Sequence, residues 1–169
     1  MGHAVHHYVA DITCCYPSDG VFTEKQKEIY RIVLKANTEV HKTAKIGTSW
    51  PSMHILAEWI ILTELQKLGI VKQDVDIDKA LEAWLGFLFM PHGLGHLVGL
   101  DVHEVGGYLP HFPERSSKWG LKSLWTAWDL EENMCITIEP GLYFVEFLLN
   151  EKFDLGFKVS DYVNIELAL

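Results

Sequence analysis

The chain has 169 residues, a length that suits one domain or one half of a larger architecture. Hydrophobic residues make up 49% of the sequence and charged residues 22%, which excludes a disordered chain and allows a buried core. The formal charge of −9 argues against nonspecific binding to nucleic acid, because such binding needs clustered lysine and arginine.

A strand followed by a long helix is predicted at the amino-terminal end. Residues 5–13 are rich in β-branched and aromatic side chains and precede a turn signal at residues 17–20. Thr23 and Gln26 have the spacing of a capping box, so we expect a helix to begin there and to end near residue 45. Its apolar positions recur at helical spacing and comprise Ile29, Val33, Ala36 and Val40.

Two further helices are predicted before residue 90. Ser49 offers a cap and Pro51 suits a first turn, and apolar residues then repeat on one face until Gly69. A shorter helix is expected over residues 77–85, because acidic residues precede it and favour a helix amino terminus. We expect all three helices to pack against a sheet.

Strands are predicted in the last third of the chain. Residues 134–139 alternate, so a strand there would present Thr137 and Glu139 on the face opposite Ile136 and Ile138. Residues 142–149 and 157–167 are also strand-like. Together with the helices, these strands predict a mixed α/β (α+β) fold.

Residues 90–107 carry the strongest chemical signal, because His92, His96 and His103 lie within twelve residues of one another. Five glycines accompany them, although glycine weakens a helix or strand by roughly 0.5–1 kcal/mol against alanine. This density is expected where the backbone must approach a ligand closely. The segment therefore predicts a metal or substrate site, whereas three unrelated surface histidines would not need the glycines.

His92 and His96 are four residues apart, as in helical zinc proteases, but three features exclude that motif. Gly93 occupies the position of the general-base glutamate, Gly95 opposes helix, and His103 lies outside the spacing of a third helical ligand. We expect one histidine to bind a metal while the others donate hydrogen bonds to a substrate, since neutral imidazole serves both roles.

The cysteines and apolar runs bear on location. Cys14, Cys15 and Cys135 lack Cys-x-x-Cys spacing, so we expect free thiols. The sequence begins without a cationic, apolar leader, and its apolar runs are too short to span a bilayer. These features predict a cytoplasmic protein with no membrane partner.

Four motifs, with their order and spacing, resemble the catalytic domain of the prolidases, the Xaa-Pro dipeptidases of the pita-bread metallopeptidase family. They are Asp11-Ile12-Thr13, His92-Gly93-Leu94-Gly95-His96, Asp101-Val102-His103 and Ile138-Glu139-Pro140-Gly141. The resemblance implies one catalytic domain over residues 1–169, without the family's amino-terminal domain. It also implies a curved antiparallel sheet flanked by helices and incomplete at both ends.

The resemblance also implies a metal site and roles for named residues. The family holds two divalent cations, usually manganese or cobalt, between two aspartates, one histidine and two glutamates. By position, Asp11 is the bridging aspartate, His96 the histidine ligand and Glu139 the first glutamate. His92 and His103 match the substrate-side histidines, and the implied substrate is a dipeptide with a carboxyl-terminal proline.

Departures from the family pattern predict a weakened site. The family's other aspartate would immediately precede Met1, and the second glutamate aligns with Ser160. We therefore expect at most a single weakly held ion, with manganese as its identity. Arginines of the family are replaced by Trp125 and Trp128, and tryptophan cannot form a bidentate pair with the carboxylate of a dipeptide.

Three functions remain open. The chain could be a working dipeptidase, or a catalytically degraded relative that forms a homodimer or associates with a full-length prolidase chain. It could also be a metal-binding or interaction module with another ligand, in which the tryptophans form an apolar patch beside the cleft. The absent ligands favour reduced or lost activity.

Overall fold

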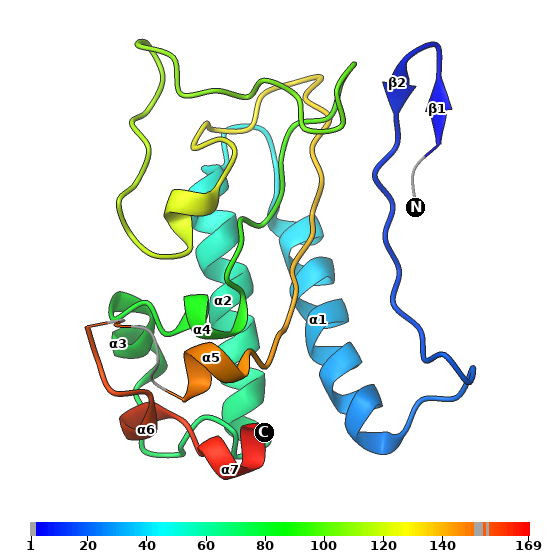
Figure 1. The fold of residues 1–169 in the computed structure, drawn as a ribbon. Helices are drawn as coiled ribbons and strands as arrows, with labels where there is room; N and C mark the ends of the chain where they lie inside the picture. Colours follow the sequence, from blue (N-terminus) through cyan, green and yellow to red (C-terminus); the bar gives the residue numbers. More distant parts are fainter. Residues whose placement is uncertain (1–2, 151–153, 155) are drawn as a thin grey trace.

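Two long helices form the frame of the molecule in the computed structural model, which describes residues 3–150, 154 and 156–169 (Figure 1). Helices α1 (Glu24–Thr43) and α2 (Trp50–Lys67) run antiparallel and pack against each other. The expected capping box starts α1: the Thr23 hydroxyl accepts from the Gln26 backbone N–H at 3.3 Å, and the Gln26 side chain accepts from the Thr23 N–H at 2.9 Å. Both long helices were therefore predicted correctly.

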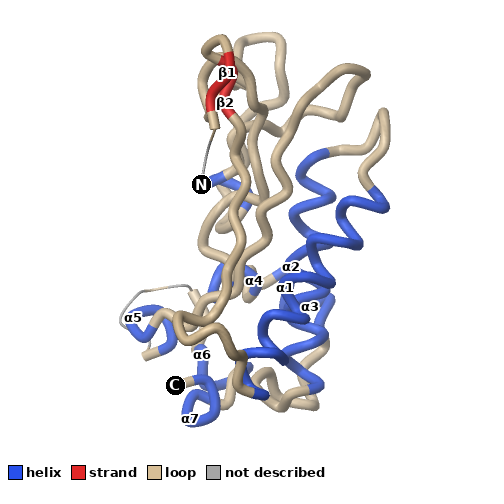
Figure 2. The backbone as a smooth tube through the Cα atoms, turned by 90° about the vertical axis from the view of Figure 1, so that its right-hand side faces the viewer, coloured by secondary structure: helices blue, strands red, loops and turns tan. Residues whose placement is uncertain are grey.

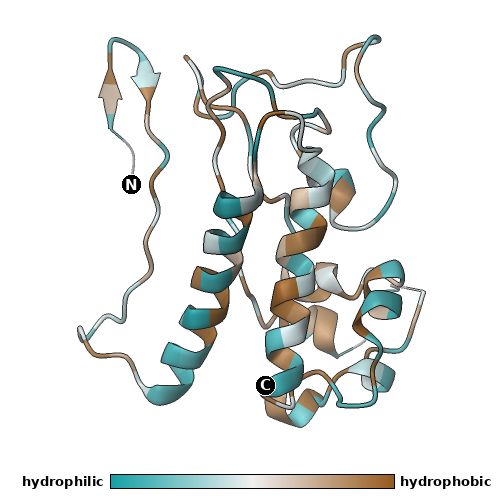
Figure 3. Cartoon of the chain, turned by 180° about the vertical axis from the view of Figure 1, so that it is seen from behind, coloured by the Kyte–Doolittle hydropathy of each residue, from teal (hydrophilic) through white to brown (hydrophobic). Residues whose placement is uncertain are grey.

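The two helices differ in how much of their surface is buried. Helix α1 buries one stripe, formed by Ile32, Ala36 and Val40, and Figure 3 shows this hydrophobic face turned toward α2. Helix α2 is buried on most sides and even encloses His54 and Glu58. The prediction of a single apolar face on α2 was too narrow, because this helix forms the centre of the core.

Short helices and a small hairpin complete the described elements. Strands β1 (Ala4–Val5) and β2 (Tyr8–Val9) pair antiparallel, and Figure 2 shows that the rest of that end of the molecule is largely loop. The remaining elements are α3 (Ile77–Glu82), α4 (Gly86–Phe89), the 3₁₀ helix η1 (Leu121–Ser123), α5 (Glu146–Leu149), α6 (Val159–Tyr162) and α7 (Ile165–Ala168).

Several predicted strands are absent or altered in the described part of the chain. The strand predicted over residues 5–13 is reduced to the hairpin, so Asp11 lies in an extended segment beyond it. Residues 146–149 form α5, and residues 157–167 contain α6 and α7 instead of a strand. These runs were misassigned because short apolar stretches fit a helix and a strand equally well.

The carboxyl-terminal helices pack at the far end of α2 (Figure 1). Val71, just beyond α2, bridges to Val163, and the Asn164 N–H donates to the Ile70 carbonyl at 2.9 Å. The Lys72 ammonium donates to the Ser160 carbonyl at 2.6 Å. Ser160 is thereby held at the carboxyl-terminal end of α2.

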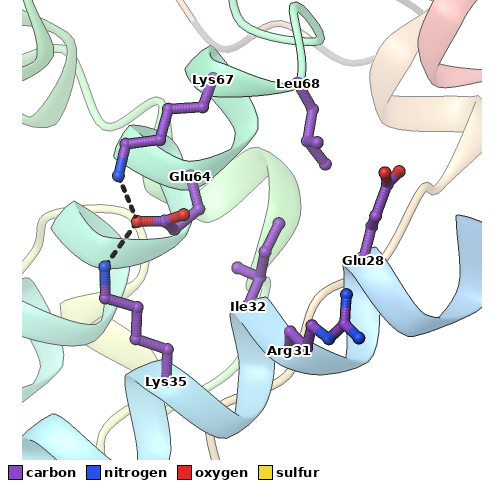
Figure 4. A pocket seen from close by; sticks show the side chains of 7 residues that line it. All are labelled: Glu28, Arg31, Ile32, Lys35, Glu64, Lys67 and Leu68. Atoms are coloured by element: carbon purple, nitrogen blue, oxygen red, sulfur yellow. Dashed lines mark hydrogen bonds and ion pairs between the residues drawn. The ribbon is translucent and has the colours of Figure 1, made fainter.

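An ion pair joins α1 to α2, and a second lysine, on α2 itself, shares the same carboxylate (Figure 4). Lys35 on α1 lies 2.6 Å from the Glu64 carboxylate on α2, and Lys67 lies 2.7 Å from it. Hydrogen bonds from Lys35 and then Lys67 lower the pKa of Glu64 below its usual 4.5. Because the folded pKa is lowered, this contribution to stability is present above pH 4.5 and is lost as the pH falls through the lower folded pKa.

We expect Glu64→Gln to reduce the free energy of unfolding at pH 7 by at most about 1 kcal/mol, the range for partly exposed ion pairs. The deficit should shrink at an acidic pH below the folded pKa of Glu64, which lies under 4.5, because the carboxyl group is then protonated. Urea unfolding at both pH values measures it. Glu28→Gln, which changes an exposed carboxylate in the same pocket, is the control; a deficit that persists at low pH would contradict the assignment.

Trp50 anchors the loops above α2 to the core. Its side chain is fully buried, its indole N–H donates to the Gly95 carbonyl at 3.4 Å, and its backbone N–H donates to the Trp128 carbonyl at 3.0 Å. The amino-terminal end of α2 therefore fixes two loop segments at once.

Trp50→Phe should lower the free energy of unfolding by about 1–3 kcal/mol, because it leaves a cavity and an unpaired carbonyl. Trp59→Phe on the same helix is the matched control, since Trp59 is 42% exposed. Its effect should stay within about 0.5 kcal/mol in urea unfolding. Equal losses for the two variants would show that the anchoring role is wrong.

Candidate metal centre

Two extended segments form an antiparallel ladder, here defined as residues 94–98 paired with residues 135–139. Backbone N–H groups of Glu139, Thr137 and Val98 donate to the carbonyls of Leu94, His96 and Cys135 at 2.7, 2.9 and 2.9 Å. Leu97 and Ile136 form a bridging pair in the same register. The strand predicted over residues 134–139 thus exists as a paired extended segment, although it is not a continuous strand.

Close backbone approach in the ladder depends on Gly95 and Thr137. A Cβ atom at Gly95 would overlap the Thr137 carbonyl oxygen, so only glycine allows this spacing. The Thr137 hydroxyl accepts from the His96 backbone N–H at 2.9 Å. This side-chain contact replaces one main-chain bond of the ladder and fixes His96 opposite Thr137.

The ladder and the amino-terminal segment bring two carboxylates to one imidazole. His96 is 2% exposed, and its Nε2 lies 2.9 Å from Glu139 Oε1 and 3.3 Å from Asp11 Oδ2. Its Nδ1 lies 3.0 Å from the Leu97 carbonyl, the geometry of an N–H that donates to that oxygen. A proton on Nδ1 would leave the Nε2 lone pair to bind a metal beside the two carboxylates, as in histidines that bind metals.

His103 approaches the same point from the loop after the ladder. Its ring meets the His96 ring edge to face, with 4.3 Å between the ring centroids. It also stacks on the Trp125 ring, with 4.7 Å between the centroids and 12° between these two ring planes. Ligand atoms of Asp11, His96 and His103 all lie within 4.8 Å of one another. The structure therefore places a second imidazole at the candidate metal centre.

Glu104 holds the turn that carries His103. Its backbone N–H donates to the Leu97 carbonyl at 2.9 Å, and its carboxylate accepts from the N–H groups of Val105 and Asp101 at 3.2 and 3.3 Å. The bonds from Val105 and Asp101 lower the pKa of the Glu104 carboxyl. The ionised side chain of Glu104 therefore closes the turn, and its backbone N–H ties the turn to the ladder.

His92 meets Tyr143 edge to face, with 5.4 Å between the ring centroids. Its Nδ1 lies 2.8 Å from the Gly93 carbonyl, whereas its buried Nε2 has no hydrogen-bond partner among the described residues. A hollow of about 410 Å³ joins these groups, and we use the word hollow for this space throughout. It is lined by Pro91, His92, Gly93, Gly95, His96, His103, Ser123, Trp125, Glu139 and Tyr143.

The structure brings together all five site residues singled out from the sequence, although they come from three separate segments. Tyr143 was missed, and the only signal for it was its position two residues after Pro140-Gly141. Trp125 lies in the hollow, as its substitution for a substrate-binding residue implied. Trp128 does not line the hollow and packs on Phe112 at 3.9 Å between ring centroids.

The sequence match assigns this arrangement to a class of enzymes. The chain belongs to metallopeptidase family M24, whose family model matches residues 1–166. Among curated relatives, Xaa-Pro dipeptidase of Mus musculus is 49% identical over 151 residues, which is 89% of this chain and 30% of the relative. The enzyme of the same name from Homo sapiens is 47% identical over the same shares. The chain thus spans about 30% of the length of these relatives.

Solved structures agree with the family assignment. Zinc-substituted aminopeptidase P of Escherichia coli, in complex with product, superposes with a TM-score of 0.68 at 36% identity, over 82% of this chain and 28% of that one. Aminopeptidase PepP of Pseudomonas aeruginosa gives a TM-score of 0.69 at 28% identity, over 91% and 31%. These matches confirm the expected pita-bread fold class, of which the chain forms a part.

None of the helices in the described residues has both the length and the apolar composition that a membrane crossing requires.

We expect Gly95→Ala to separate the two sides of the ladder and to cost about 1–3 kcal/mol, as overpacking against backbone does. Divalent metal binding should weaken together with the thermal midpoint, as followed by calorimetry and circular dichroism. Gly106→Ala is the matched control, because the atoms nearest to its Cβ would be side-chain atoms of Leu97 and Thr126 at 3.1–3.5 Å, with no backbone atom among them. A Gly95→Ala protein that behaves like this control would exclude the proposed close approach.

Proposed function

We propose that this chain is a metallopeptidase domain that binds one divalent cation through Asp11, His96 and Glu139, and that its hydrolysis of Xaa-Pro dipeptides is strongly reduced or lost. The convergence of the two carboxylates on His96 Nε2 carries the metal part of this proposal. Two carboxylates with one imidazole form a mostly oxygen ligand set, which suits manganese.

The residues around the centre support a hydrolytic site. A bound divalent ion supplies an activated water for attack on a peptide carbonyl. His92 lines the hollow and its buried Nε2 has no hydrogen-bond partner among the described residues, so a substrate carbonyl or amide that reached it would satisfy it. His103 also lines the hollow and provides a further imidazole that can orient the same substrate.

Among the described residues, no carboxylate of the carboxyl-terminal segment joins the group of possible metal ligands that could hold a second ion. Ser160, which aligns with the family's last glutamate, lies on α6 at the carboxyl-terminal end of α2, whereas Trp50 ties the ladder to the amino-terminal end. The 18 residues of α2 span about 27 Å. Two dications about 4 Å apart repel by on the order of 16 kcal/mol at an effective dielectric of 20, so fewer carboxylates favour a single ion.

The hollow is also poorly suited to the free carboxylate of a dipeptide. No lysine or arginine is among the described residues that line it, and Trp125 stands where the family has a carboxylate-binding arginine. The closest guanidinium along the chain, that of Arg115, donates to the carbonyls of Lys122 and Leu124 at 2.9 and 2.6 Å. A dipeptide with carboxyl-terminal proline would therefore bind without a charge partner.

A non-catalytic interaction protein is the second candidate. The amino-terminal segment exposes large apolar side chains, among them Tyr8, Ile12, Tyr16 and Val21 at 62–78% exposure. Such a surface suits a second copy of this chain or a full-length Xaa-Pro dipeptidase.

A cytoplasmic location belongs to the proposal as well, and the free, exposed thiols of Cys14, Cys15 and Cys135 support it.

Titration calorimetry with Mn²⁺ should show one weak site per chain, and His96→Ala should remove it. Gly-Pro hydrolysis with excess Mn²⁺ should be at or near background, and Trp125→Arg alone should not restore it. Full-length Xaa-Pro dipeptidase of Mus musculus is the positive control for the assay.

Two tight Mn²⁺ sites, or Gly-Pro hydrolysis that His96→Ala abolishes, would show instead a working dipeptidase. Co-elution with the full-length mouse enzyme in size-exclusion chromatography would support the interaction protein. Failure to co-elute, combined with metal binding, would leave the single-ion metallopeptidase domain as the remaining candidate.

A further inference from the structure

We propose that His103 completes a second ligand set with Asp11 and His96, and that this set takes a nitrogen-preferring divalent ion such as Zn²⁺. The inference rests on the proposed metal function, because both ligand sets share Asp11 and His96. It adds that the identity of the bound ion decides whether Glu139 or His103 is the third ligand.

The placement of the three donor groups supports the second set. Their ligand atoms lie within 4.8 Å of one another, a spread that small side-chain movements can close around one ion. His96 and His103 meet edge to face, with ring planes at 79°, so the two imidazoles do not stack on and block each other. Asp11 is partly exposed and can adjust toward either ring.

Two contacts hold His103 in this position. Trp125 covers one face of its ring in a nearly parallel stack, and the backbone N–H of the next residue, Glu104, donates to the Leu97 carbonyl of the ladder. Because the ring is already positioned, ligation by His103 costs less side-chain entropy than ligation by an unrestrained histidine.

Ligand chemistry distinguishes the two sets. Asp11, His96 and Glu139 offer two carboxylates and one imidazole, whereas Asp11, His96 and His103 offer two imidazoles and one carboxylate. Carboxylate oxygens suit Mn²⁺, and imidazole suits Zn²⁺, Ni²⁺ and Cu²⁺. Three protein ligands also fit Zn²⁺ with an open fourth position. Because two ligands are shared, the ions compete for one place.

Crossed titrations test the inference on the intact chain. Calorimetry with Zn²⁺ and with Mn²⁺ is carried out on the parent, on His103→Phe and on Glu139→Gln. Phenylalanine retains an aromatic ring that can stack on Trp125 but has no ring nitrogen to bind a metal. His111→Phe, which changes another exposed histidine of the same chain segment outside the hollow, is the matched control.

We expect His103→Phe to weaken Zn²⁺ binding by at least about tenfold, the lower bound for losing even a group that only supports a metal ligand. The same variant should change Mn²⁺ binding by less than about threefold, and Glu139→Gln should show the opposite preference. Zn²⁺ should also change the fluorescence of Trp125 in the parent, compared with Trp125→Phe, because the ion binds to the ring stacked on the indole.

The outcomes separate this inference from the proposed function. If neither ion binds to the parent, the proposed metal centre itself fails. If ions bind but His103→Phe leaves Zn²⁺ affinity unchanged, or weakens Zn²⁺ and Mn²⁺ equally, only the inference about His103 is overturned. A loss of Zn²⁺ affinity in His111→Phe of the same size would likewise overturn it.

Discussion

The backbone ladder between residues 94–98 and 135–139 is the constraint on which the candidate site depends. It holds His96 opposite Thr137 and brings the start of the Glu139 side chain close enough to reach the imidazole. Gly95 is essential to this spacing because any side chain there would meet the carbonyl of Thr137. The glycine-rich histidine segment is therefore explained by close contact between two backbones as well as by access for a ligand.

The ladder is itself tied to the core through Trp50. This buried indole donates to the Gly95 carbonyl, and Trp50 begins the helix that forms the centre of the hydrophobic core. Loops that carry functional side chains are positioned by such scaffolds. The residues of the candidate metal centre lie on loops and extended segments and not on helices. Their positions nevertheless depend on α2, because Trp50 holds the ladder in place.

The sequence predicted the parts of this structure that depend on local signals. Capping at Thr23 and helical spacing through Val40 describe α1 without reference to the rest of the chain. The pairing of residues 94–98 with 135–139 depends on contacts about forty residues apart and was not predicted; the family resemblance implied only that His96 and Glu139 share a metal site. The residues after 142 show where local reasoning fails, since short apolar runs do not distinguish α5 from a strand.

Burial of the three ligands differs, and this difference explains why weak binding is expected. His96 is enclosed and held by two hydrogen bonds, so its imidazole is preorganised. The side chains of Asp11 and Glu139 are 25% and 44% exposed, so each loses rotamer freedom and hydration when it binds an ion. One fixed nitrogen with two adjustable carboxylates can accept an ion, but it cannot impose a geometry on it. Selectivity in such a centre must come from the third ligand. The imidazole of His103, which lies beside Asp11 and His96, therefore matters more for selectivity than a carboxylate at the distant position of Ser160 would.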